Sequence, residues 1–312
     1  MKTFHLANTD LTVPAVVAGM MRIKDLSDAE VRGLFDAALD VGINFFDHAD
    51  IYGGGSHQCE QRFAEALRLS PSQREQIVLQ TKAGIIIGPD VTTFDFSHDH
   101  IIEAVDGSLR ALRTDYIDIL LLHRPDALVE PEEVAQAFDE LQAAGKVRHF
   151  GVSNHTPDQI ELLKRCVTQP LVANQVQISL THSPAIAQGL AVNMSWTEQS
   201  TSRDNGLVDY CRLHDITLQA WSPYQNPDWS GTFLGNDDQP ELNAALARIG
   251  AQYGVTAMGA ATAWLTRHPA NIQVVTGTTQ PSRLREAAAG SDVVLTKPQW
   301  YELFQLAGHI IP

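Results

Sequence analysis

Four polar residues recur along this sequence at intervals that could place them in one site. Asp47 ends an apolar run, Lys82 ends the next and His123 ends the one after, while Tyr52 follows Asp47 in a short loop. The steps from Asp47 to Lys82 and from Lys82 to His123 are each about the length of one strand and one helix. If the runs are neighbouring parallel strands, their carboxyl ends bring these side chains together.

These residue types suit the delivery of a proton to an oxygen that is becoming an alkoxide. The Tyr52 phenol has an ordinary pKa of about 10, which a neighbouring Lys82 ammonium lowers. Asp47 would pair with Lys82, and a neutral His123 could polarise a substrate carbonyl. Each residue alone is also explained by a solvated strand end, but their joint occurrence favours carbonyl reduction by hydride.

The elements that must hold these residues alternate between short apolar runs and amphipathic helices. The sequence predicts strands at 13–19, 43–47, 77–82, 116–123, 149–154, 171–177, 216–222 and 272–277. Helices are expected to begin at Ser27, which forms a capping box with Glu30, and at Pro131, Thr156 and Pro281. Eight such units predict an α/β fold, the (β/α)8 TIM barrel. An open doubly wound sheet is the alternative, but it expects a Gly-x-Gly-x-x-Gly after the first strand, which this sequence lacks.

Further elements flank the predicted barrel. Residues 4–13 contain a turn and predict a short N-terminal hairpin at the bottom of the barrel, and Thr296 predicts the start of an extra C-terminal helix. Two helices, around 242–249 and 255–267, precede the last strand. No linker-like change of composition divides the chain, so we predict a single domain over residues 1–312.

The composition narrows the possible partners. The chain has 22 basic and 37 acidic residues, a net charge of -15, which argues against nucleic acid and against an anionic membrane surface. No apolar run reaches about 18 residues, the minimum for a membrane span. Cys59, Cys166 and Cys211 form no CxxC pair, which favours reduced thiols in a cytoplasmic protein. We therefore expect a small-molecule ligand held by a local pocket.

Other constellations are weaker. His98 and His100 have a metal-like spacing, but they open a helix, so we expect a surface position and no metal site. The glycine-rich segment 53–56 lacks the Gly-Lys-Ser/Thr of a P-loop, and no nucleophile elbow is present. Met20, Met21, Ile23 and Ile85 follow two of the strands and either line an apolar mouth or simply pack.

Several segments resemble the signature segments of the aldo-keto reductase superfamily. They are FFDHADIYG (45–53), LQTK (79–82), LLLHRPD (120–126), GVSN (151–154), NQVQ (174–177), AWSPY (220–224) and VTGTTQPSRLRE (275–286). They occur in the family's order and spacing over essentially the whole chain, with most likeness to the family's bacterial oxidoreductases. The resemblance implies a (β/α)8 barrel that uses NADPH to reduce an aldehyde or ketone to an alcohol.

The resemblance also assigns residues. It implies that Tyr52 is the general acid, Lys82 lowers its pKa, Asp47 orients Lys82 and His123 positions the carbonyl. The cofactor residues that it implies are Ser153, Asn154 and Gln175 at the carboxamide, Trp221 against the nicotinamide, Ser222 and Pro223 at the pyrophosphate, and Glu286 in the adenine segment.

The far end of the cofactor also has a physical rationale. Gly277, Thr278 and Thr279 precede a helix N-terminus, where backbone N–H groups bind anions, and Arg283 can fork onto a phosphate. The NADP 2′-phosphate is thus expected to contact Arg283, which predicts a preference for NADPH over NADH.

The sequence departs from the family pattern at three places. His48 stands where Thr or Ser is usual, Ala287 replaces an adenine-binding Asn, and Tyr224 and Gln225 replace a commoner Leu-Gly after Pro223. Ala287 is expected to weaken the hold on adenine, and the direction of His48 stays open.

Two other functions compete with a reductase. A cofactor-binding regulatory subunit with little turnover would have less need of a complete Tyr, Lys, Asp and His set. A metal-dependent barrel hydrolase would want His-x-His after the first strand, where Ala18-Gly19-Met20 stands. The substrate depends on loops 20–25, 85–96, 178–204 and 224–239, which sequence patterns do not shape. We expect a monomer and leave an oligomer open.

Overall fold

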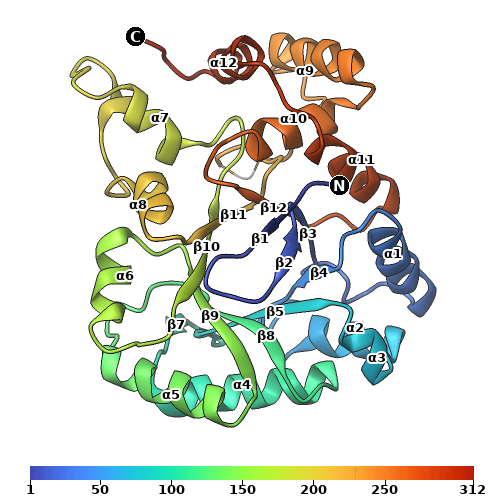
Figure 1. Cartoon of the computed structure of the whole chain (residues 1–312), viewed down its shortest axis with the longest axis vertical. Coiled ribbons are helices and arrows are strands. Elements are labelled where there is room, and N and C mark those ends of the chain that lie inside the picture. Colours follow the sequence, from blue (N-terminus) through green and yellow to red (C-terminus); the bar gives the residue numbers. More distant parts are fainter. Residues whose placement is uncertain (229) are drawn as a thin grey trace.

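Eight parallel strands close into a barrel in a computed structural model that describes residues 1–228 and 230–312 (Figure 1). Each strand pairs with the next in the chain, and the last pairs with the first through Val274 and Val16. The strands are β3 (Val16–Gly19), β4 (Phe45–Asp47), β5 (Val78–Ala83), β8 (Ile117–Leu122), β9 (Val147–Ser153), β10 (Leu171–Gln177), β11 (Thr217–Trp221) and β12 (Gln273–Thr276). Closure confirms the predicted (β/α)8 barrel and excludes the open sheet.

Helices surround the barrel between its strands (Figure 1). They are α1 (Asp28–Asp40), α2 (Gln58–Leu67), α4 (His98–Leu112), α5 (Pro131–Ala143), α6 (Pro157–Lys164), α8 (Leu207–Leu213), α10 (Ala257–Thr266) and α11 (Pro281–Ser291). The predicted capping box joins Ser27 to Glu30, and Thr156 caps α6 in the same way through Gln159. These side chains accept the N–H groups that a helix start leaves unpaired, so the local sequence sets where the helices begin.

An N-terminal hairpin closes the bottom of the barrel. Strands β1 (Thr3–His5) and β2 (Thr12–Pro14) pair antiparallel, as predicted, so the run predicted as one strand over 13–19 is divided between β2 and β3. Leu6 and Val13 of this segment are fully buried against the interior side chains Phe45 and Ile119. The lower half of the barrel interior is therefore a dry apolar layer.

The C-terminal part adds helices outside the barrel. The predicted final helix is α12 (Lys297–Leu306), which lies beside α9 (Pro240–Tyr253) in Figure 1. Trp300 of α12 stacks on Trp264 of α10 with ring centroids 4.9 Å apart, and each indole N–H donates to the other residue's backbone carbonyl. At Gly290 a Cβ atom would lie 2.1 Å from the Gly259 carbonyl oxygen, so α10 and α11 approach as closely as glycine allows.

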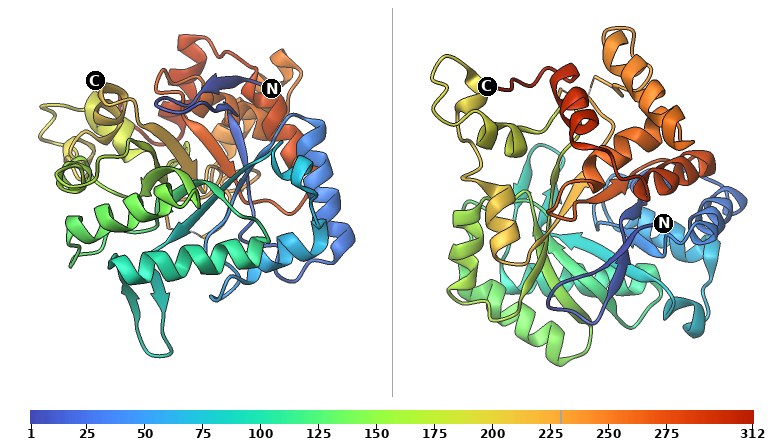
Figure 2. Two further views of the ribbon diagram at one scale, coloured as in Figure 1. Left: turned by 60° about the horizontal axis from the view of Figure 1, so that its bottom comes forward. Right: turned by 45° about the horizontal axis from the view of Figure 1, so that its top comes forward.

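The sequence patterns missed four short features, which comprise five elements. One is the antiparallel hairpin of β6 (Ile85–Ile87) and β7 (Thr92–Phe94), which projects from the opposite end of the barrel to the N-terminal hairpin (Figure 2). The others are α3 (Pro71–Arg74), α7 (Pro184–Leu190) and the 3₁₀ turn Glu198–Ser200. Each is only one or two turns or three residues long, too short for a hydrophobic period to register.

The three cysteines are free thiols, as expected, and Cys59 and Cys211 are buried. In the part of the chain that the structure describes, no helix is long and apolar enough to cross a membrane.

Candidate active site

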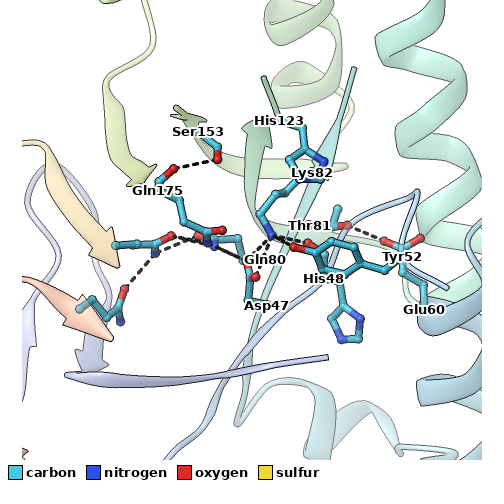
Figure 3. Close-up of polar contacts among 12 residues, drawn as sticks. Asp47, His48, Tyr52, Glu60, Gln80, Thr81, Lys82, His123, Ser153 and Gln175 are labelled. Atoms are coloured by element: carbon cyan, nitrogen blue, oxygen red, sulfur yellow. Dashed lines mark hydrogen bonds and ion pairs between the residues drawn. The ribbon is translucent and has the colours of Figure 1, made fainter. Parts of the chain in front are cut away.

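The four polar residues at the strand ends meet at the carboxyl end of the barrel (Figure 3). Lys82 Nζ donates to both Asp47 carboxylate oxygens, at 2.8 and 2.7 Å, and to Tyr52 Oη at 3.1 Å. The Tyr52 and His123 rings lie edge to face, 5.9 Å apart. The predicted grouping is therefore present, with Tyr52 Oη and His123 both lining a cavity that opens beside them.

The loop between β4 and α2 places Tyr52 over Lys82. It is wound tightly by backbone hydrogen bonds from Tyr52 to Ala49, from His57 to Asp50 and from Cys59 to Tyr52. The Asp50 N–H donates to the Lys82 carbonyl oxygen, which fastens the loop to β5. The loop thus carries the phenol on a backbone that is anchored at both ends.

Burial changes the proton affinities from what the sequence predicts. Burial raises the pKa of Tyr52 above its usual value, although the Lys82 charge beside it acts in the lowering direction. Burial lowers the pKa of Lys82, but Asp47 and Tyr52 outweigh it and raise that pKa overall. Lys82 therefore acts on the Tyr52 pKa in the predicted direction, but the net pKa lies above its ordinary value because the loss of solvent around the phenol outweighs the effect of the cation.

His123 is held neutral beside the phenol. Burial, followed by the charges of Lys82 and Arg124, brings the pKa of His123 well below its usual value. Its Nδ1 has no hydrogen-bond partner within residues 1–228 and 230–312. A neutral imidazole that faces the cavity can donate its one N–H to a carbonyl oxygen.

A layer of four glutamines underlies these residues, and sequence reasoning missed three of them. Gln80 and Gln175 donate to Asp47 Oδ1 at 2.6 and 3.1 Å. Gln219 donates to Gln80 and Gln273, and Gln273 donates to the Pro14 carbonyl oxygen at 2.7 Å. Figure 3 shows the Gln80 and Gln175 side chains converging on Asp47. A glutamine inside each of several otherwise apolar strands was the sequence signal for it.

His48 points away from the cavity. Its carbonyl oxygen accepts from Lys82 Nζ at 2.8 Å, but its ring is fully buried against Phe63, with centroids 4.8 Å apart. Burial lowers the pKa of His48 to about 4, so the ring is neutral. The residue that replaces the usual Thr or Ser therefore packs behind the site and does not face a ligand.

A second buried polar group fastens α2 to β5. The Glu60 carboxylate accepts from Thr81 Oγ1 at 2.5 Å and contacts His57 Nδ1 at 2.6 Å. Asp50 lies nearby, and burial, followed by the Glu60 charge, raises its pKa to about 7. These residues hold the loop that carries Tyr52 from its outer side.

The cavity beside Tyr52 is a groove of about 910 Å³ that runs from Tyr52 and His123 to α11. Every predicted cofactor residue lines it: Ser153, Asn154, Gln175, Trp221, Ser222, Pro223, Gly277, Thr278, Thr279, Arg283 and Glu286. Lys82 alone among the predicted site residues lies behind the lining.

At the near end of the groove, Asn154 sets the position of the indole. It adopts a left-handed backbone conformation with φ of 61°. Its Oδ1 accepts from Trp221 Nε1 at 3.0 Å, and its Nδ2 donates to Ser153 Oγ and to the His123 carbonyl oxygen. Ser153 Oγ in turn donates to the Gln175 carbonyl oxygen. An amide-bearing ring would meet an aromatic face and several polar atoms here.

At the far end of the groove, Gly277 has no side chain, which leaves space next to the charged residues there. A Cβ atom at Gly277 would lie 2.7 Å from an Arg22 guanidinium nitrogen, which itself donates to the Gly277 carbonyl oxygen. Glu286 accepts from Thr256 at 2.7 Å, and Arg283 is exposed at the rim. Ala287 is fully buried and does not line the groove. Arginine, hydroxyl groups and a helix N-terminus form a donor set that fits a phosphorylated nucleotide.

Some lining residues had no sequence signal of their own. They are Arg22, Arg124, Leu234, Thr256 and Met258, among others. Tyr224 is partly buried in the groove wall, where its hydroxyl group is hydrogen-bonded to Thr262 Oγ1 at 2.7 Å. The loop predicted at 224–239 includes residue 229, which lies outside the described residues.

The weaker constellations stay apart from the groove. His98 lies at the start of α4 and contacts the carboxylates of Asp99 and Glu140. Met20 and Ile23 are buried in the core, whereas Met21 lines the groove. No cluster of three potential metal ligands occurs within residues 1–228 and 230–312.

Known proteins resemble this chain over its whole length. The family model described as the aldo/keto reductase family matches residues 15–307. An uncharacterized oxidoreductase, YcsN, from Bacillus subtilis is 36% identical, with all of both chains covered. A 6-dehydroglucose reductase from Agrobacterium fabrum is also 36% identical, over 95% of each chain. The solved structure of a putative 2,5-diketo-D-gluconic acid reductase B superposes with a TM-score of 0.69 at 29% identity, covering 94% of this chain and 88% of that one.

Proposed function

The chain belongs to the aldo/keto reductase family, a family of oxidoreductases, and we propose that it reduces an aldehyde or ketone to an alcohol with NADPH. One observation carries the proposal furthest. Lys82 Nζ lies between the Asp47 carboxylate and Tyr52 Oη, and Tyr52 and His123 together face the near end of the long groove. That arrangement supplies a proton at the place where a carbonyl oxygen would bind.

Each residue has a distinct part in the proposed reaction. NADPH, when bound, supplies the hydride. Neutral His123 donates a hydrogen bond to the carbonyl oxygen and fixes its direction. Tyr52 gives its phenolic proton to that oxygen as negative charge develops, and the Lys82 ammonium stabilises the phenolate that remains. Asp47 keeps Lys82 charged although the Lys82 side chain is fully buried.

The raised pKa of Tyr52 is compatible with this part. Burial keeps the phenol protonated between turnovers, so the acid is present at neutral pH. The hydrogen bond from Lys82 Nζ, at 3.1 Å, is strongest when the oxygen becomes negative. The cation therefore acts mainly on the transition state.

For the cofactor we propose that Ser153, Asn154 and Gln175 hold the carboxamide and that Trp221 lies against the nicotinamide. At the other end Arg283, with Thr278 and neighbouring N–H groups, would bind the 2′-phosphate. The chain as a whole carries a net charge of -15, which repels the negatively charged 2′-phosphate. The positive charge of Arg283 at that position offsets the repulsion, and for this reason we expect NADPH to bind more tightly than NADH.

For the substrate class we propose a hydroxylated, sugar-derived carbonyl compound. The names of two relatives, the 6-dehydroglucose reductase and the putative 2,5-diketo-D-gluconic acid reductase B, both denote such compounds. A single domain over residues 1–312, a monomeric state and a cytoplasmic location remain predictions.

The test is NADPH oxidation, followed by its absorbance, across a panel of aldehydes, ketones and quinones. We expect turnover with several aldehydes and its loss in Tyr52→Phe. NADPH binding without oxidation of any member would instead indicate the regulatory subunit with little turnover.

A further inference from the structure

A second cavity adjoins the groove near its chemical end. It has a volume of about 440 Å³ and shares three lining residues with the groove: Arg124, Asn154 and Trp221. Its other side is formed by the segment that follows β10, through His182 and Leu207. Because these three residues line both spaces, the two cavities are neighbours, and a ligand bound at the carbonyl site would have its far end close to the second cavity.

Arg124 is the charged residue among the three that line both cavities. It follows His123 directly, so the two Cα atoms are about 3.8 Å apart. Its guanidinium lies 5.6 Å from the centroid of the Trp221 ring and is partly buried. Among the ion pairs of residues 1–228 and 230–312, none includes Arg124. A partly buried guanidinium without a counter-ion keeps several N–H donors for an anion.

The other charged groups of the cavity are already engaged. Arg203 forms an ion pair with Glu198 at 2.7 Å, and Asp204 accepts a hydrogen bond from Gln188. Both belong to the segment after β10, which lines the cavity together with Arg124. Arg124 therefore differs from Arg203 as the cation of this lining that joins no ion pair within residues 1–228 and 230–312.

The imidazoles of the cavity do not neutralise or add to that charge. Burial lowers the pKa of His155 to about 4, and its ring stacks on Phe96. Burial and the neighbouring His309 lower the pKa of His182. Both rings are neutral at physiological pH and offer hydrogen bonds suited to hydroxyl groups.

We propose that this cavity binds the far end of the carbonyl substrate and that Arg124 binds a carboxylate there. The proposal rests on the reductase function above and narrows its substrate class to carbonyl compounds that carry an acid group. His123 and Arg124, as chain neighbours, would then hold the carbonyl oxygen and the carboxylate of one small molecule.

A matched pair of aldehydes tests the proposal. In 4-carboxybenzaldehyde and 4-formylbenzamide the distal group is a carboxylate or a carboxamide of nearly equal size. Because a charge-assisted contact gains roughly tenfold or more over a neutral one, we expect wild-type kcat/KM to favour the acid by about that factor, mainly through KM. The ratio should fall as salt is added.

Variants of Arg124 sharpen that test. Arg124→Gln should bring the acid-to-amide ratio to about one, while Arg124→Lys should retain part of the preference. Arg165→Gln removes the same charge from the far end of α6 and should leave the ratio unchanged. An acid-to-amide ratio near one in the wild type, or equal losses for both aldehydes in Arg124→Gln, would overturn the proposal. So would a loss confined to NADPH affinity, because Arg124 would then serve the cofactor.

A second variant probes the cavity without touching its charge. Ala185→Phe places a bulky side chain into the lining. We expect KM to rise for both benzaldehydes and to stay constant for propanal, which is too short to reach the cavity. A rise for propanal as well, or no rise for the longer aldehydes, would exclude the cavity as the distal site.

The anion site can be tested separately, even if the protein turns out not to be a reductase. If no carbonyl compound is reduced, calorimetric titration of the NADPH-loaded protein with 4-carboxybenzaldehyde and with 4-formylbenzamide still measures the anion site. Tighter binding of the acid to the wild type, lost in Arg124→Gln, would support the site while the reductase assignment fails. Equal binding of the two would overturn it.

Discussion

The two ends of the groove hold their charges in opposite ways. At the near end Lys82 and Asp47 are at most 2% exposed, and Lys82 Nζ has four acceptor atoms around it. At the far end Arg283 is exposed and joins no ion pair in the described part of the chain. The near end is therefore organised before any ligand arrives, whereas the far end depends on the ligand for its partner.

This difference has a physical consequence. In a dry environment each charge costs several kcal/mol unless its partner is in place, so the near end contributes to folding as well as to chemistry. In water a single cation costs little and is screened by salt. Substitutions at the near end should change stability and turnover, and substitutions at the far end should change affinity alone.

The largest expected effect is that of Lys82→Met. It leaves the buried Asp47 carboxylate unpaired, which should lower the free energy of unfolding by about 3–5 kcal/mol and remove most turnover. Lys146→Met, which breaks the half-exposed pair with Asp106, should cost at most about 1 kcal/mol. Urea denaturation measures both, and Asp47→Asn in the Lys82→Met background should restore part of the stability. If Lys82→Met lowers the free energy of unfolding no more than Lys146→Met does, the buried pair of Lys82 and Asp47 does not contribute to stability in this way.

Next is Tyr52→Phe, which removes one proton and little volume. Turnover should fall about 10²-fold or more, since general acid catalysis supplies about that factor, while NADPH affinity stays the same. Tyr116→Phe, at the bottom of the barrel, is the matched control and should turn over normally. If Tyr52→Phe stays within a few-fold of the wild type in kcat, the proton has another source.

Asp50→Asn tests whether the free energy of unfolding depends on pH through the buried carboxyl group of Asp50, near Lys82. Since the pKa of Asp50 is raised from 3.8 to about 7, the folded protein holds a proton that the unfolded chain releases in that range. The free energy of unfolding therefore falls as pH rises from about 4 to 7. The variant should avoid this loss and be more stable than the wild type by roughly 2–4 kcal/mol at pH 8, with the gap closing towards pH 4.

The control for that experiment is Asp36→Asn, an exposed carboxylate on α1. Thermal unfolding at pH 4.5 and pH 8 should show no such dependence for it. If Asp50→Asn is instead less stable than the wild type at pH 8, and that deficit closes towards acid, Asp50 is ionised in the fold and paired there.

The smallest effect is expected at the exposed end. Arg283→Ala should weaken NADPH binding by about 10- to 150-fold, leave NADH binding nearly unchanged and leave stability untouched. Arg285→Ala, two residues along the same helix but outside the groove, should change neither affinity. Tryptophan fluorescence during titration at two salt concentrations measures both, because Trp221 lies in the groove. Equal losses for NADPH and NADH would assign Arg283 to the shared pyrophosphate, and a wild type that binds NADH more tightly would refute the cofactor preference.

Much of the fold can be predicted from patterns among residues close together in the sequence. The alternation of apolar runs with capped helices predicts the barrel, because β-strand and helix periods and N-cap hydrogen bonds involve residues close in sequence. The same order places Asp47, Lys82 and His123 at successive strand ends, which the structure brings together. Short elements such as β6, β7 and α7 escape because three to seven residues hold fewer than two full periods, too few for a strand or helix pattern to stand out.

By itself the sequence determined which residues stand at the strand ends and where the helices begin. Three features were decided only by the tertiary structure. They are the pKa of Tyr52, the layer of glutamine side chains beneath Asp47, and the position of Arg124, without an ion-pair partner in the described residues, beside a second cavity. The physical reason is that burial and pairing are sums over neighbours far apart in the chain. Gln80 and Gln219 are 139 residues apart yet hydrogen-bonded, and no local pattern contains that contact.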